Sequence, residues 1–233
     1  MKYIYHHLGL GDHIICNGLV RSLISKDLQY TMFVKPHNRP TIEFMYRDLD
    51  NLFFIEGDDF FVNEFIKKND VSSQNLIIAG FYSHPQAFHF DDSFYLQNNV
   101  PFEYRWEKFK VIRDENREMN LFKKFQVEEG NYIFIHDDSS RGFVIDDNVV
   151  INKDLPIIRP VVGLTNNSFD YCYLMEKSYE SHFIDSSLRL IFDSLCLRNT
   201  NIFYHLKMKN EVRRNSNKFS DASVGKLNFT VIE

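Results

Sequence analysis

The strongest constraint on the fold is a regular alternation of strand-like and helix-like patterns through the first 81 residues. Short runs rich in β-branched and aromatic residues alternate with longer stretches whose apolar residues recur at helical spacing. Strands that alternate with helices form a parallel sheet covered by helices. The pattern predicts strands at 2–9, 30–36, 51–57 and 75–81, and helices at 11–25, 39–49 and 58–68.

The alternation pauses over 84–118 and then restarts. The pause is rich in aromatic and charged residues, which predicts a long loop entering one or two helices, with the aromatics as packing or as an acceptor-binding surface. Pro156 and Pro160 indicate an edge or broken strand. The restart predicts strands at 131–138, 155–163, 180–185, 201–206 and 227–233, and helices at 169–178 and 186–197.

We therefore expect an α/β fold of two Rossmann-like units, 1–125 and 126–233, with parallel sheets facing across a cleft. The net charge of −5 disfavours a broad nucleic-acid surface, so no nucleic acid is expected as a partner. Cys16, Cys172 and Cys196 are far apart and lack paired spacing, which disfavours a disulfide framework or a zinc site and favours the cytoplasm. The sequence has no run of about 18 apolar residues, so we expect no membrane span.

The stretch HHLGLGDH, residues 6–13, places a tight turn between the first strand and the first helix. Gly9 and Gly11 bring the backbone close to the carboxyl edge of the sheet, where open α/β sheets bind ligands. Asp12 and His13 follow at the start of the helix, where backbone N–H groups attract anions. The simpler alternative is a tight turn whose Asp12 caps the helix.

The stretch IHDDSSRGF, residues 135–143, ends the strand that opens the second half. Ser139, Ser140 and Arg141 offer hydroxyls and a guanidinium suited to phosphate oxygens. Asp137 and Asp138 are carboxylates, but no third one has convincing spacing, so we expect no metal site. The alternative is a polar turn.

The third stretch, residues 180–197, again joins a strand to a helix. His182 and Asp185 end the strand, and Ser186 and Ser187 begin the helix, which predicts a second phosphate-binding position. Either Asp185 or Ser186 is a natural helix cap, so ordinary capping is the alternative.

Together these stretches resemble the GT-B glycosyltransferases, most closely the bacterial heptosyltransferase family, in a shortened form. Gly11-Asp12 resembles the Gly-Asp pair with which that family begins its first helix. The Ser139–Arg141 loop resembles its second-domain loop near the donor phosphates, and Asp185-Ser186-Ser187 resembles its motif at the helix under the diphosphate. The family's usual His after that last motif is absent, with residues 188–191 in its place. The Lys expected after the second-domain loop has no clear counterpart, and Arg141 is the residue that would substitute for it.

The resemblance implies a metal-independent transfer from a nucleotide-diphosphate sugar, which is a substrate and not a cofactor, to a glycan or lipid-linked acceptor. The first domain would bind the acceptor and the second the donor. The donor-binding residues would be Ser139–Arg141, His182 and 185–187 of the second domain, together with Gly11 of the first. Asp12 would match the general base, and His6, His7 or His13 are alternatives because imidazole titrates near neutral pH. A lipid-linked acceptor would bring the protein to a membrane surface as a peripheral partner.

Two other functions fit the same residues. One is a non-catalytic sugar- or nucleotide-binding relative, which the short chain favours. The other is a different nucleotide-dependent transferase of polysaccharide synthesis, because the same phosphate-binding positions would serve it.

Overall fold

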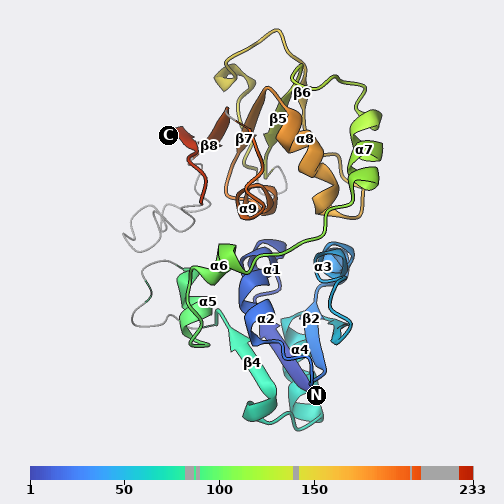
Figure 1. Ribbon diagram of the computed structural model, residues 1–233, viewed down its shortest axis with the longest axis vertical. Coiled ribbons are helices and arrows are strands. Elements are labelled where there is room, and N and C mark those ends of the chain that lie inside the picture. The colour runs from blue at the N-terminus through green and yellow to red at the C-terminus, as the bar shows by residue number, and fades with distance from the viewer. Residues whose placement is uncertain (82–86, 88–89, 139–141, 200, 206–225, 233) are drawn as a thin grey trace. The chain divides into compact units, whose positions relative to one another are not determined.

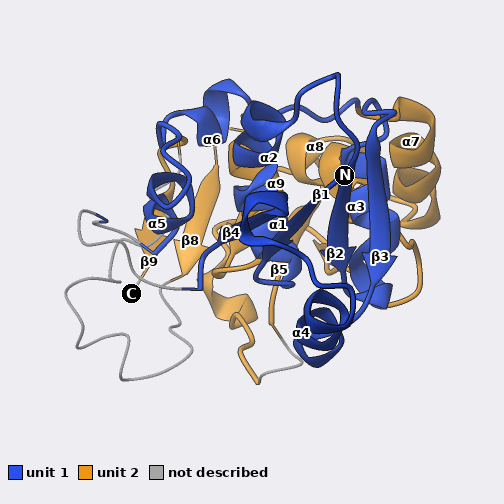
Figure 2. Cartoon of the chain, turned by 90° about the horizontal axis from the view of Figure 1, so that it is seen from below, with its two compact units in different colours: residues 1–112, 221–223 blue, residues 113–220, 224–233 orange. Residues whose placement is uncertain are grey.

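The computed structural model describes residues 1–81, 87, 90–138, 142–199, 201–205 and 226–232. The chain divides between Ile112 and Arg113 into two compact units, which Figure 2 shows in blue and orange. Helix α7 (Glu115–Lys124) belongs to the second unit, although the sequence placed the boundary after residue 125. It belongs there because Phe122 is buried against the rings of Tyr132 and Tyr173.

Unit 1 contains a four-stranded parallel sheet in the order β3-β2-β1-β4, whose four strands are labelled in Figure 2; Figure 1 labels β2 and β4. The alternation expected from the sequence is confirmed strand by strand. The strands are β1 (Lys2–His6), β2 (Tyr30–Val34), β3 (Leu52–Glu56) and β4 (Leu76–Ala79). The central β2 is buried along its whole length, as a strand covered on both faces should be.

Helices α1 (Leu10–Ile15) and α2 (Asn17–Leu23) stand where the sequence predicted one helix, because the chain breaks at Cys16. Tyr95 holds the break: its hydroxyl donates to the carbonyl of Ile15 at 2.6 Å and accepts from the N–H of Leu19 at 3.2 Å. The other helices of this unit are α3 (Arg39–Met45), α4 (Asp59–Lys68), α5 (Asp92–Leu96) and α6 (Tyr104–Glu107), with 3-10 turns η1 (Pro36–Asn38) and η2 (Ser73–Asn75).

Unit 2 contains a five-stranded parallel sheet in the order β6-β5-β7-β8-β9. The two-residue β6 lies at the edge between Pro156 and Pro160, which confirms the expected edge strand. The strands are β5 (Ile133–His136), β6 (Ile157–Ile158), β7 (Glu180–Phe183), β8 (Ile202–His205) and β9 (Thr230–Ile232).

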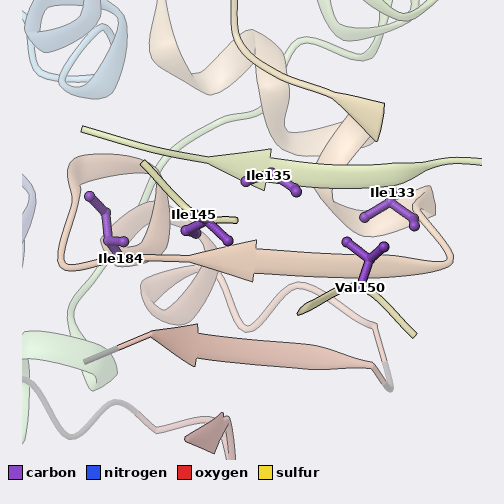
Figure 3. Packing of buried hydrophobic residues seen from close by; sticks show 5 residues of the cluster. All are labelled: Ile133, Ile135, Ile145, Val150 and Ile184. Atoms are coloured by element: carbon purple, nitrogen blue, oxygen red, sulfur yellow. The ribbon is translucent and has the colours of Figure 1, made fainter. Parts of the chain in front are cut away.

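One face of this sheet is covered by the irregular segment 143–155, which includes the 3-10 turn η4 (Asp147–Val149). Figure 3 shows the apolar cluster at this contact. It consists of Ile133 and Ile135 from β5, Ile145 and Val150 from the covering segment, and Ile184 after β7. The remaining helical elements are η5 (Ser168–Tyr171), α8 (Cys172–Lys177) and α9 (Ser187–Ser194). Within the described ranges, no helix combines the length and the apolar character needed to cross a membrane.

Candidate functional site

The carboxyl edge of the unit 2 sheet gathers polar residues from two neighbouring strands. Strands β5 and β7 are parallel partners, with His136 opposite Phe183, so the residues that follow each strand lie together. The clearest contact is between His136 and Ser186, whose Nδ1 and Oγ atoms are 2.7 Å apart.

Ser186 is the N-cap of α9, as the sequence allowed. Its Oγ accepts the N–H of Arg189 at 3.4 Å, and Ser187 is the first helical residue. Asp185 stands just before the cap and accepts a hydrogen bond from the Arg189 guanidinium at 3.2 Å. Three of the predicted site residues, 185–187, therefore stand at the positive end of an eight-residue helix.

The sequence analysis missed His136, although it singled out the stretch that contains it. Burial lowers the pKa of this imidazole to about 4, so the ring is neutral near pH 7 and contributes a hydrogen bond without a charge. The sequence could have indicated His136 by its position as the last residue of β5. Residues at the carboxyl end of one strand in a parallel sheet lie close to those at the carboxyl end of its neighbour, which here is β7.

We expect Ser186→Ala to lower the free energy of unfolding by about 1–2 kcal/mol, because the helix cap and the partner of His136 are lost together. Ser187→Ala is the matched control, since that residue begins the helix and does not cap it. Denaturant unfolding of the two variants measures the difference. Equal stability of both variants would contradict the role of Ser186.

Asp137, the first carboxylate after β5, already accepts hydrogen bonds from groups within the protein at both of its oxygens. Its Oδ1 accepts the N–H of Ile145 at 2.7 Å, and its Oδ2 accepts from Nε of Arg159 at 2.7 Å. The predicted phosphate-binding residues Ser139, Ser140 and Arg141 lie outside the described residues. Where the chain is described, no group of three or more His, Cys, Asp or Glu side chains is arranged to hold a metal ion.

His182 does not lie at this edge, although the sequence analysis placed it among the donor-binding residues. Its ring is fully buried within the sheet, with Nε2 2.9 Å from the Glu180 carboxylate and Nδ1 2.9 Å from Nε2 of His205. Glu180 in turn accepts the N–H groups of Ile151 and Asn152, at 3.0 and 2.9 Å. The alternation of side chains along β7 turns His182 toward the covering segment, where it helps to hold that segment on the sheet.

In unit 1, Asp12 occupies the third position of α1, after the N-cap Gly9 and the residues Leu10 and Gly11. A Cβ atom at Gly9 would lie only 2.6 Å from a carboxylate oxygen of Asp12, so the carboxylate lies over the backbone of the cap. Gly9 thus leaves room for this carboxylate, and Asp12 as a residue is partly exposed to solvent.

The imidazoles around Asp12 differ in their access to solvent. His6 is buried, donates from Nδ1 to the carbonyl of His7 at 2.8 Å, and has a pKa lowered by burial to about 4. His13 is fully buried with its ring edge-on to that of His6 at 4.3 Å, and burial lowers its pKa well below the usual 6.5. His13 therefore lies beneath the surface as a neutral ring, whereas His7 is partly exposed.

A hollow of about 450 Å³ lies in unit 2 between α7 and the segment 163–170. Its cationic groups have partners within the protein: Arg117 bonds the carboxylate of Asp170 at 2.9 Å, and Lys124 bonds the carbonyl of Leu164 at 3.2 Å. The hollow contains none of the residues that the sequence pointed to as a site.

No family model matches this sequence, and no curated protein matches it. Among solved structures, the chain is similar to the glycosyl transferase family 9 from Veillonella parvula DSM 2008. The two chains are 8% identical, the match covers 88% of this chain and 80% of that chain, and the TM-score is 0.51. At this identity the similarity concerns the fold, and it supports the expected α/β class with two parallel-sheet units.

Proposed function

We propose that this protein is a glycosyltransferase that moves a sugar from a nucleotide-diphosphate sugar to a glycan or lipid-linked acceptor. The observation that carries the proposal is the similarity in fold, over 88% of the chain, to a protein described as a glycosyl transferase. A fold alone does not define an activity. The polar residues at the carboxyl edges of both sheets therefore supply the second part of the argument.

The donor diphosphate would bind at the carboxyl edge of unit 2. The N–H groups that begin an α-helix lack acceptors in the helix backbone and, with the helix dipole, favour an anion. In α9 the N–H of Arg189 already bonds Oγ of Ser186, so the anion would bind in front of this cap. The hydroxyls of Ser186 and Ser187 stand at this helix end, and Ser139, Ser140 and Arg141 would add donors from the preceding loop. Such donors stabilise the charge that develops on the leaving diphosphate.

The acceptor would bind unit 1, with Asp12 as general base. The acceptor hydroxyl oxygen attacks the anomeric carbon, the bond from that carbon to the diphosphate oxygen breaks, and the hydroxyl proton passes to the Asp12 carboxylate. The diphosphate leaves with the bonding electron pair. Asp12 is the proposed base because this residue is partly exposed, whereas His13, the next residue along the chain, is buried.

A thermal-shift screen of nucleoside diphosphates and their sugar conjugates tests this function. A ligand at about 100 times its Kd should stabilise the native protein by about 2.7 kcal/mol, because it binds only the folded state. We expect one nucleotide base to give a clearly larger shift than the others. A screen in which no nucleotide raises the melting temperature would contradict the proposal, and binding without sugar transfer would support the non-catalytic alternative.

We further expect nucleotide binding to persist without a divalent metal. Asp137, the first carboxylate beside the proposed diphosphate position, already bonds Arg159 and the N–H of Ile145. Titration calorimetry with and without EDTA measures the effect, and the affinity should change little. Loss of binding on chelation, restored by Mg²⁺ or Mn²⁺, would show that a metal ion takes part.

A further inference from the structure

The carboxyl edge of the unit 1 sheet also carries a pair of polar and aromatic side chains, His7 and Phe81. This pair is separate from Asp12 and from the buried imidazoles of His6 and His13. Strands β1 and β4 are parallel partners with His6 opposite Ala79, so His7 lies next to Gly80 and Phe81. The Nε2 atom of His7 is 2.7 Å from the carbonyl oxygen of Gly80.

This contact determines which nitrogen of His7 carries the hydrogen. A carbonyl oxygen can only accept a hydrogen bond, so Nε2 is the donor. In the neutral ring, Nδ1 is then a hydrogen-bond acceptor. His7 is partly exposed, in contrast to His6 and His13, which are buried.

Phe81 lies directly against this imidazole. Its ring centroid is 4.7 Å from that of His7, at an interplanar angle of 31°, and 4.5 Å from that of Tyr5. Tyr5 is itself held by a hydrogen bond from its hydroxyl to Oδ1 of Asp59 at 2.8 Å. Phe81 nevertheless remains 40% exposed. An exposed aromatic ring that packs on Tyr5 therefore lies next to the imidazole of His7, whose Nδ1 atom can accept a hydrogen bond.

This pairing matches the chemistry of a pyranose ring. One face of such a ring presents C–H groups, which pack on the electron-rich face of an aromatic ring, and its edge presents hydroxyl donors. A single exposed Phe is ordinary in a protein. The combination with a fixed imidazole acceptor, at the sheet edge where α/β proteins bind ligands, distinguishes Phe81 from an ordinary surface residue.

We propose that Phe81 and His7 form a binding position for a sugar ring of the acceptor, with the C–H face on Phe81 and one hydroxyl donating to Nδ1 of His7. The choice of a sugar rests on the proposed glycosyltransferase function. The position itself uses residues of unit 1 alone.

Saturation-transfer NMR on the full chain, with a panel of methyl glycopyranosides at about 10 mM, tests the proposal because that concentration populates a millimolar site. We expect saturation on the ring C–H protons of at least one glycoside. Phe81→Ala should weaken that binding about ten-fold, whereas Phe81→Trp should retain it. Phe53→Ala is the matched control, because Phe53 is a similarly exposed aromatic, 46%, on edge strand β3.

The role of His7 has its own readout. In ¹⁵N-histidine NMR, the bound glycoside should shift the Nδ1 resonance of His7 while Nε2 keeps its hydrogen. His7→Leu should weaken binding, and His7→Gln should preserve most of it because the amide supplies both a donor and an acceptor. Should His7→Leu fail to fold, the Phe81 variants and the resonance of the native protein decide.

The outcomes separate this position from the proposed function. Glycoside binding that depends on Phe81, in a protein that binds no nucleotide, would support the sugar position and contradict the glycosyltransferase. If no glycoside receives saturation, or if Phe81→Ala binds as well as the native protein, the sugar position is wrong even where nucleotides bind.

Discussion

Asp12→Asn should lower the rate of sugar transfer by about 100-fold or more, since general-base catalysis typically contributes 10²–10⁴. The amide keeps the size of the carboxylate and fits the same space over Gly9, but it cannot take the proton of the acceptor hydroxyl. Nucleotide affinity should remain nearly unchanged, because the proposed donor position lies in the other unit. Steady-state kinetics with the donor identified by the thermal-shift screen, together with nucleotide titration, measures both effects.

Asp50→Asn serves as the control, because it removes an exposed carboxylate of the same unit. This variant should transfer sugar at the native rate. Both variants should unfold at nearly the native temperature, since a carboxylate in the first turn of a helix contributes only about 0.3–1 kcal/mol. If purified Asp12→Asn also transfers at the native rate, Asp12 merely stabilises the start of α1, and the general base must be sought elsewhere.

Most of the fold could be predicted from the sequence because apolar runs and helical spacing are local signals. Features that depend on distant partners could not. The break at Cys16 reflects the hydroxyl of Tyr95, which bonds Ile15 and Leu19 on the two sides of the break although it lies 80 and 76 residues from them along the chain. The boundary lies after Ile112 and not after residue 125, because Phe122 of α7 is buried against the rings of Tyr132 and Tyr173, which come later in the sequence.

The site shows the same division between local and distant causes. Capping is local, so Ser186 could be recognised from its place between a strand and a helix. His136 could not be paired with Ser186 without knowing that β5 and β7 are neighbours, since 50 residues separate the two. The sequence analysis placed His182 among the donor-binding residues because it lies near the end of a predicted strand. In the structure its side chain points to the covered face of the sheet from β7, where it is buried beside Glu180 and His205.

A buried ion pair in unit 1 should have the largest effect on stability. Arg105 and Asp91 are both almost completely buried and form a salt bridge. The guanidinium carbon of Arg105 also lies 5.0 Å from the ring centre of Trp106, the only tryptophan of the chain. Burial of both charges makes each dependent on the other, because a lone charge away from water is strongly destabilising.

We therefore expect Arg105→Met to lower the free energy of unfolding of unit 1 by about 3–5 kcal/mol, because the Asp91 carboxylate stays buried without its cation. Denaturant unfolding followed by Trp106 fluorescence reports on this unit, and Arg198→Met, on an exposed arginine of unit 2, is the control. The double variant Arg105→Met/Asp91→Leu should recover most of the loss, because it removes both charges. A double variant as unstable as Arg105→Met alone would mean that Arg105 stabilises the unit through packing on the aromatic rings and not through Asp91.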